Sequence, residues 1–274
     1  MCCERTGHLS RSRRQWADSE RERISTLPAR RYRFVVSFST ACLPVAGRLW
    51  IWRPLNNPTS VRTSSFRDTN PRGFGLLQRD RVFDHYQDLE AHYEKRPSVW
   101  IEPIGDWGKG AVQLVEIPSD ADWYDNIVSF WVPDEPAVAD TEWRFDYRMY
   151  FALDQPNLPP GGKTYATYVG RGGSGGVIEP NKRKFVIDFT GGALDELAPD
   201  AAVEAVVTAS SGTIDNKVVH HNDHIDGWRV FFELKPAGDA PVELRCFLKQ
   251  GGDALTETWS YQWSPKPQVS EEKP

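Results

Sequence analysis

The sequence predicts an all-β protein with two β domains joined by a short linker. Strand-length segments in which apolar and polar residues alternate support this prediction, as do the turn residues between them. A third observation is the segment 153–162, whose three prolines and two glycines are typical of a linker between domains. The chain has 274 residues, of which 39% are hydrophobic, and this is enough for two packed cores.

The first domain, expected over residues 50–152, contains one helical pattern. Aromatic residues recur at helical spacing between residues 83 and 93, and Pro97 follows, so we expect a short amphipathic helix there. Glu90 and Glu94 would lie one helical turn apart. They could form a catalytic pair, but the solvated face of the helix is the simpler interpretation.

Two strands are expected nearer the linker. Residues 142–151 alternate between apolar and mostly charged side chains, which predicts a half-buried antiparallel strand. Its apolar face would carry Trp143, Phe145, Tyr147, Met149 and Phe151. Residues 127–132 are apolar on both faces, which predicts a strand enclosed between two layers.

The second domain, expected over residues 163–265, contains six further segments that we interpret as short strands. They are residues 183–189, 203–209, 217–221, 228–234, 242–248 and 258–263. Strands at this spacing predict a β-sandwich of the immunoglobulin type. Cys246 lies in an alternating segment, so we expect a small core residue rather than a nucleophile.

Two segments of this domain imitate functional sites. Residues 170–176 are rich in glycine, but no Gly-Lys-Ser/Thr and no helix follow, so we expect a flexible connection rather than a phosphate-binding loop. His220, His221 and His224 accompany two aspartates in one turn, which cannot easily enclose a tetrahedral ion. We therefore expect a solvated hairpin, with no metal site and no cofactor.

Charge is divided unevenly along the chain. The first 50 residues carry ten Arg, no Lys and four acidic residues, whereas the net charge of the whole chain is −5. The Arg-rich segment lacks the helical periodicity and interleaved aromatic residues of a nucleic-acid or membrane contact, and the acidic remainder disfavours a polyanion. We therefore expect no nucleic-acid partner. The four cysteines form no CxxC motif and predict no disulfide framework.

Residues 1–49 contain no element that we can assign, and residues 266–274 are expected to be a disordered tail. Arginines followed by the apolar segment 34–46 weakly resemble a secretory signal, but Ser, Thr and Pro interrupt the apolar part. We expect a wrong start or a shifted reading frame to explain this leader. No segment reaches the ~18 apolar residues of a membrane span.

The segment 70–81 carries the densest chemistry in the chain. Gln78, Arg79, Asp80 and Arg81 place four polar side chains in succession after two glycines. A carboxylate between two guanidinium groups can form a surface ion pair or bind a polyol. If the segment is extended, alternation would place both arginines on the face opposite Asp80 and Gln78 beside it, an arrangement that suits a protonated acid.

Aromatic residues could supply stacking surfaces for sugar rings. Trp107 and Tyr124 have glycine or acidic neighbours, which are typical of loops, so both are candidates for stacking. Trp100 is expected in the core.

Short, uncommon sequence motifs follow one another in a fixed order over residues 50–264. They occupy residues 51–58, 72–81, 88–90, 96–98, 105–110, 115–118, 125–128 and 130–131. In this order they closely resemble the periplasmic glucan biosynthesis protein G/D family. The resemblance implies the C-terminal part of a large β-sandwich similar to the mutarotase fold, followed by an immunoglobulin-like sandwich. It also implies a protein of the periplasm.

The resemblance further implies a role in making osmoregulated periplasmic glucans, whose backbone is β-1,2-linked glucose. Members of this family include inverting β-1,2-glucanases, which require two carboxyl groups. Carried onto this sequence, the general acid falls on Asp80, with Phe74, Gln78, Arg79 and Arg81 as substrate-binding residues. The family's second catalytic carboxylate lies upstream of the matched region.

Two other interpretations stay open. The chain could be a noncatalytic module that binds or scaffolds β-glucan, because the second carboxylate is not among the matched residues. It could also be an immunoglobulin-like interaction domain that works with the membrane-bound glucan synthase.

Overall fold

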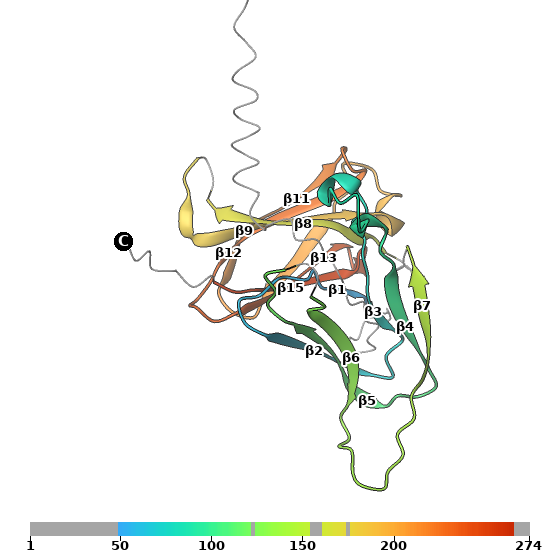
Figure 1. Cartoon of the computed structure of the whole chain (residues 1–274). Helices are drawn as coiled ribbons and strands as arrows, with labels where there is room; N and C mark the ends of the chain where they lie inside the picture. Colours follow the sequence, from blue (N-terminus) through green and yellow to red (C-terminus); the bar gives the residue numbers. More distant parts are fainter. Residues whose placement is uncertain (1–48, 122–123, 154–160, 174–175, 266–274) are drawn as a thin grey trace, which may run out of the picture.

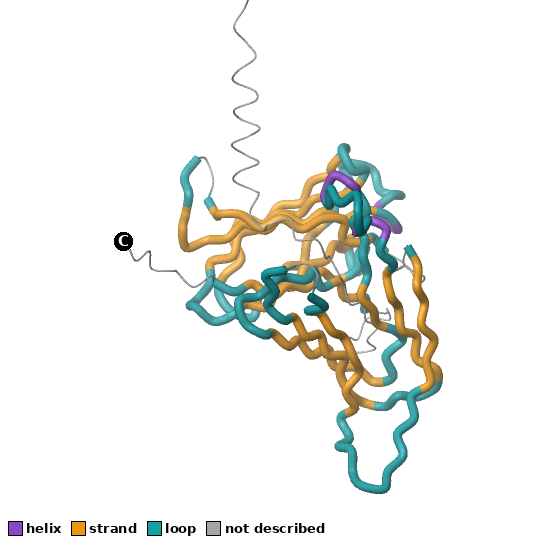
Figure 2. Tube along the Cα trace, viewed as in Figure 1, coloured by secondary structure: helices purple, strands orange, loops and turns teal. Residues whose placement is uncertain are grey.

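The computed structural model describes residues 49–121, 124–153, 161–173 and 176–265 (Figure 1). Strands dominate these residues, and their helical parts are short 3-10 turns (Figure 2). The predicted all-β class is therefore confirmed. None of the helices in the described ranges has the length and apolar character that crossing a membrane requires. The leader expected over 1–49, Leu49 apart, and the tail 266–274 lie outside the described residues.

The C-terminal residues form a two-layer β-sandwich. One antiparallel sheet has the order β11 (Thr213–Asn222), β12 (Gly227–Lys235), β9 (Glu179–Thr190) and β8 (Lys163–Gly172). The other has the order β1 (Ile51–Trp52), β15 (Thr258–Trp263), β13 (Val242–Gln250) and β10 (Glu204–Ala209), with β14 (Asp253–Ala254) paired to β13. In Figure 1 the sheet of β8, β9, β11 and β12 lies at the top of the view, and β13 and β15 lie beneath it.

Apolar side chains from both sheets fill the space between the layers. The fully buried ones include Phe185, Ile187, Phe189, Val230, Phe232, Leu234, Leu244, Cys246, Leu248 and Trp259. They occur at alternate positions of their strands, because successive side chains of a strand point to opposite faces. The six strands predicted in this domain and the core position of Cys246 are thus confirmed.

The predicted flexible connection over 170–176 is wrong at its start. Gly170 and Gly172 belong to β8 and pair with β9. A Cβ atom at Gly172 would lie 2.3 Å from the Cβ atom of Lys182, so the two strands approach more closely there than a side chain allows. Glycine serves close backbone contact here rather than flexibility. Residues 174–175 of the expected connection lie outside the described residues.

Two three-stranded antiparallel sheets lie beside the sandwich. One has the order β2 (Arg62–Thr69), β5 (Lys109–Glu116) and β6 (Ile127–Pro133). The other has the order β3 (Phe74–Leu76), β4 (Ser98–Ile104) and β7 (Asp146–Ala152). Buried residues from both sheets, from β1 and from the connection between β4 and β5 form a second, smaller core, which contains Ile51, Phe74, Trp107, Val112 and Leu114.

Two strands of these sheets are more exposed than their sequences predict. In β6, expected between two layers, Val128 and Phe130 are 46% and 41% exposed. The strand predicted over 142–151 begins only at Asp146, pairs with β4 as an antiparallel neighbour, and exposes Met149 and Phe151 on its apolar face. Alternation identifies the apolar face of a strand but does not show whether a second layer covers it.

The helix predicted between residues 83 and 93 is also wrong. The structure has two separate 3-10 turns, Phe83–His85 and Tyr93–Lys95. Gln87 and His92 have φ values of 54° and 49°, in the left-handed region that interrupts a right-handed helix. The carboxylate of Asp88 accepts hydrogen bonds from the backbone N–H groups of the second and third residues that follow. Such a local turn competes with a helix.

The two parts of the molecule are joined through β1. This strand precedes both three-stranded sheets in the sequence, yet it pairs with β15 in parallel. Trp50 stacks on Trp100 with ring centroids 6.0 Å apart. Arg53, which is 1% exposed, donates a hydrogen bond of 2.7 Å to Glu243. The domain boundary expected over 153–162 remains a prediction, and residues 154–160 lie outside the described residues.

Candidate active site

The loop over residues 77–82 follows β3, and hydrogen bonds of its buried residue Gln78 hold it in place. This residue is 3% exposed. Its backbone N–H donates to the Ser98 hydroxyl at 3.0 Å, and its side-chain amide donates to the carbonyl oxygens of Tyr93 and Asp80 at 2.7 and 3.2 Å. Gln78, predicted to bind substrate, is therefore buried, and its side chain holds the backbone of Asp80.

Arg79 joins the loop to the sandwich. Its guanidinium group forms two hydrogen bonds, of 2.5 and 2.9 Å, with the carboxylate of Glu257, which is buried. The same group donates to the carbonyl oxygen of Thr164 at 3.2 Å and lies 3.3 Å from the centroid of the Trp52 ring. Arg79 is thus engaged on three sides in an ion pair, a backbone contact and a cation–π contact.

Arg81 joins the loop to the second 3-10 turn. Its guanidinium group donates to the carbonyl oxygens of Glu94 and Arg96 at 2.9 and 2.8 Å. The residues 78–81 form a loop, so the extended arrangement considered from the sequence is not present. Both arginines nevertheless bind groups from other segments of the chain and anchor the loop at its two ends.

Asp80 lies between these anchors and pairs with a histidine. Nδ1 of His85 lies 2.8 Å from both carboxylate oxygens of Asp80. The carboxylate also accepts the backbone N–H of Val82 at 3.3 Å, and the Tyr86 hydroxyl donates to the Asp80 carbonyl oxygen at 2.8 Å. The side chain of Asp80 is 13% exposed, whereas that of His85 is 57% exposed.

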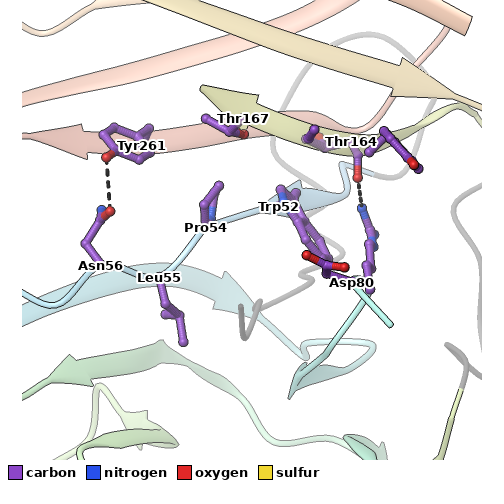
Figure 3. A pocket seen from close by; sticks show the side chains of 11 residues that line it. Trp52, Pro54, Leu55, Asn56, Asp80, Thr164, Thr167 and Tyr261 are labelled. Atoms are coloured by element: carbon purple, nitrogen blue, oxygen red, sulfur yellow. Dashed lines mark hydrogen bonds between the residues drawn. The ribbon is translucent and has the colours of Figure 1, made fainter. Parts of the chain in front are cut away.

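Asp80 lines one end of a small pocket where the loop meets the sandwich (Figure 3). The pocket has a volume of about 60 Å³. Its lining residues are Trp52, Pro54, Leu55 and Asn56 beside β1, Arg79 and Asp80 from the loop, Thr164, Tyr165, Ala166 and Thr167 from β8, and Tyr261 from β15. Among these residues of the described chain, Asp80 is the one carboxylate.

Tyr261 closes the end of the pocket opposite Asp80 in Figure 3. Its hydroxyl donates to the side-chain oxygen of Asn56 at 3.0 Å. Burial raises the pKa of Tyr261 to about 12, so the hydroxyl keeps its proton at neutral pH. The pocket therefore combines the carboxylate of Asp80 and the guanidinium group of Arg79 with neutral polar groups and aromatic rings, a combination that suits a sugar.

The structure does not bring the other predicted substrate-binding residues to this pocket. Phe74 and Trp107 are buried in the smaller core, where their ring centroids lie 6.3 Å apart. The indole N–H of Trp107 donates to the carbonyl oxygen of Asp146 at 3.1 Å. Tyr124 is 58% exposed in the connection between β5 and β6. Trp100 lies in the core, as predicted.

Two further groups were considered as candidate sites from the sequence: the pair Glu90 and Glu94, and the histidine-rich turn between β11 and β12. Glu90 is exposed as expected, but Glu94 is buried, with Lys95 at 3.7 Å from its carboxylate, so its predicted place on a solvated face is wrong. The turn between β11 and β12 is solvated as predicted, and its Asp223 accepts a hydrogen bond at 2.8 Å from His221, near the end of β11. Across the described ranges, no group of three His, Cys, Asp or Glu side chains could hold a metal ion.

Sequence reasoning missed His85 and Glu257, which contact the loop directly. The spacing from Asp80 to His85 matches no motif with a known geometry, and 178 residues separate Arg79 from Glu257. A carboxylate directly before the strand at 258–263 was the one available signal for Glu257, and it did not identify a partner.

Comparisons with known proteins add to this geometry. The family model described as "Periplasmic glucan biosynthesis protein, MdoG" matches residues 43–263. A probable glucans biosynthesis protein D of Shewanella oneidensis is 48% identical over 225 residues, which cover 80% of this chain and 41% of that protein. Glucans biosynthesis protein D 2 of Ralstonia nicotianae is 47% identical over 224 residues, covering 78% and 40%. Glucans biosynthesis protein D of Stenotrophomonas maltophilia is 46% identical over 230 residues, covering 82% and 42%.

Proposed function

Because the chain belongs to the periplasmic glucan biosynthesis (MdoG) family, we propose that it takes part in making glucan in the periplasm. We further propose that the protein acts on a glucan with a β-1,2-linked backbone and that Asp80 is its general acid. The chain spans about two fifths of the length of the curated relatives it matches. The activity of a whole protein of that length is therefore part of the proposal.

The position of Asp80 is the observation that carries this proposal. Its carboxylate is mostly covered, lines a pocket with polar and aromatic walls, and is the one carboxylate in that lining within the described chain. Arg79 and Arg81 fix the backbone on either side of it. A proton donor needs a fixed position relative to the leaving oxygen, and these anchors supply one.

The reaction needs a second group besides Asp80. Cleavage of a glycosidic bond with inversion uses one carboxylic acid to protonate the leaving oxygen and a second carboxylate to activate water, with the two about 6.5–9.5 Å apart. In this proposal Asp80 gives its proton to the leaving oxygen. The second carboxylate comes from outside the pocket lining described above, in the part of the relatives' length that this chain does not span.

The test uses a longer protein in which the upstream region of the Shewanella oneidensis relative precedes residue 50 of this chain. Linear β-1,2-glucan is the substrate, reducing ends measure turnover, and proton NMR follows the anomeric configuration of the product. We expect turnover with inversion, a loss of about 100-fold or more in Asp80→Asn, and no turnover by the 274-residue chain alone.

Asp84→Asn is the matched control, because Asp84 is an exposed carboxylate close to Asp80 in the sequence. It should leave turnover within about twofold, since a general acid contributes only from the position of the leaving group. Undiminished turnover in Asp80→Asn would contradict the proposed role.

A second candidate is a noncatalytic module that binds glucan and works with the membrane-bound glucan synthase. The observation that favours it is the composition of the pocket, which has Trp52, Tyr165 and Tyr261 as aromatic walls but a single carboxylate among its described lining residues. Saturable binding of β-1,2-glucan in calorimetry, without turnover by the longer protein, would support this candidate over the first.

A further inference from the structure

The contact between Asp80 and His85 supports one more inference, which rests on the proposed role of Asp80. We propose that His85 is a proton relay, which carries a proton from solvent to Asp80 after Asp80 has protonated a leaving group. His85 does not touch the substrate in this role. It acts through Asp80.

The exposures of the two side chains suit a relay. Asp80 is 13% exposed and His85 is 57% exposed, so water reaches the imidazole ring far more readily than the carboxylate. The ring binds Asp80 through Nδ1, which lies 2.8 Å from each carboxylate oxygen. This geometry leaves Nε2 to exchange protons with water.

The other charged groups around Asp80 are poor candidates for this task. Arg79 and Arg81 flank it on the same loop, and a guanidinium group does not give up its proton in a protein. Asp84 lies on the same 3-10 turn as His85, and its carboxylate accepts a hydrogen bond from the Gln87 side chain at 3.4 Å. The Tyr86 hydroxyl donates to the Asp80 carbonyl oxygen rather than to the carboxylate. Imidazole is the side chain whose ordinary titration range includes neutral pH.

Each proton that the relay moves has a source and a destination. With Asp80 ionised, the neutral His85 ring donates Nδ1–H to the carboxylate. A proton from a water-borne acid adds to Nε2 and gives the imidazolium. The Nδ1 proton then passes to a carboxylate oxygen, which leaves Asp80 protonated and the ring neutral with its proton on Nε2. When Asp80 has given its proton to a leaving oxygen, exchange with water returns the ring to the Nδ1–H form.

The first test observes the ring itself in the 274-residue chain. The six histidines are labelled with nitrogen-15, and the His85 signals are those that disappear in His85→Gln. At a pH where the ring is neutral, we expect the proton mainly on Nδ1, and mainly on Nε2 in Asp80→Ala, because the carboxylate stabilises the Nδ1–H form. A His85 ring that carries its proton on Nε2 in both proteins would overturn the inference.

The second test measures turnover of the longer protein on β-1,2-glucan. We expect His85→Ala to lower kcat about tenfold or more, with recovery when imidazole is added to the buffer. His85→Gln, which can hold the carboxylate but cannot relay a proton, should stay slow. His224→Ala, in the exposed turn between β11 and β12, is the matched control and should match wild type.

The outcomes separate the inference from the function on which it rests. Loss of turnover in Asp80→Asn together with wild-type kcat in His85→Gln would overturn the relay and leave the proposed function intact. Undiminished turnover in Asp80→Asn would overturn both. Failure of imidazole to restore His85→Ala would also contradict the relay, because a purely structural histidine is not replaced by free imidazole.

Discussion

Glu257 and Arg79 are 178 residues apart in the sequence, and their side chains meet in a two-point ion pair of 2.5 and 2.9 Å. The same carboxylate accepts the backbone N–H of Thr164 at 2.8 Å. Glu257, the residue before β15, thus binds both the Asp80 loop and the start of β8 through one buried side chain. These are three of the segments that line the pocket or border it.

Removing Arg79 should destabilise the protein strongly. Arg79→Met leaves the Glu257 carboxylate buried without its charged partner, and such a change typically costs about 3–5 kcal/mol. The double variant Arg79→Met with Glu257→Gln should lose less than the sum of the single changes, because it leaves no unpaired charge. Urea unfolding followed by tryptophan fluorescence measures the free energy of unfolding.

Arg67→Met is the matched control for this prediction. Arg67 pairs with Asp134 at 2.5 Å, but the two side chains are 72% and 36% exposed. Exposed ion pairs contribute at most about 1 kcal/mol. Equal destabilisation by Arg67→Met and Arg79→Met would show that the contact with Glu257 is no stronger than a surface ion pair.

Gly75→Ala should disrupt the strand that leads into the Asp80 loop. A Cβ atom at Gly75 would lie 2.1 Å from the carbonyl oxygen of Val99 and 2.9 Å from the Cα atom of Trp100. Both are backbone atoms of β4, so no side-chain rotation relieves the contact. We expect a loss of about 1–3 kcal/mol or more, measured as a lower Tm. Gly252→Ala, which meets no atom within 4 Å, should change stability by less than about 0.5 kcal/mol.

Glu116 should make the protein less stable as pH rises. Burial raises the pKa of Glu116 above its ordinary value of 4.5, although the Asn56 N–H and the charge of Arg62 oppose this effect. The folded protein therefore keeps this proton at pH values where the unfolded chain has lost it, and stability falls as pH rises from about 4.5. In Glu116→Gln this fall should disappear from a series of urea unfolding curves between pH 4 and 7.

Glu243 should act in the opposite direction. Burial would raise its pKa, but the hydrogen bond and charge of Arg53 outweigh burial and hold the pKa of Glu243 below 4.5. Its contribution to stability is present above pH 4.5 and is lost as pH falls through the lowered value. Glu243→Gln should weaken the dependence of stability on acid pH when the series of urea unfolding curves is extended below pH 4. If the two substitutions changed the slope of stability against pH in the same direction relative to wild type, this assignment would be contradicted.

Proteolysis tests the domain boundary proposed over residues 153–162. Its proline and glycine content predicts cleavage there. The two fragments should stay together on size-exclusion chromatography, because β1 pairs with β15 and Arg79 with Glu257 across the two parts. They should separate only in denaturant. A resistant chain would argue against the boundary, and fragments that separate without denaturant would argue against the interface.

Most of the sandwich could be predicted from the sequence, because a strand with one buried face leaves a period of two in its apolar residues. Trp228, Val230 and Phe232 show that pattern and are buried in β12. The same pattern was misleading in β7, where Tyr147 and Met149 alternate correctly but face solvent. Periodicity depends on one strand alone, whereas burial depends on what lies opposite.

The candidate site could be located from the sequence but not built from it. The segment around Asp80 was identified by its composition, yet the roles of its neighbours depend on contacts far along the chain. Gln78 binds the backbone of Tyr93, and Arg79 binds Glu257. The sequence does not distinguish a glutamine or arginine that holds the loop from one that binds a sugar. Phe74 lies next to glycines as a loop residue would, but its ring fills the smaller core.

The pocket also depends on the parallel pairing of β1 with β15. Ile51 lies opposite Thr258, and Arg53 donates to the Ser260 hydroxyl 207 residues later. Among the described strands β1 pairs with β15 alone, so this pairing closes a loop of 207 residues, and contacts of such long sequence separation slow folding. The meeting of Trp52 and Tyr261, which face the same pocket from these two strands, therefore depends on a contact between distant parts of the chain. A chain that is truncated before β15 would carry the Asp80 loop without Tyr261, which lies at the opposite end of the pocket.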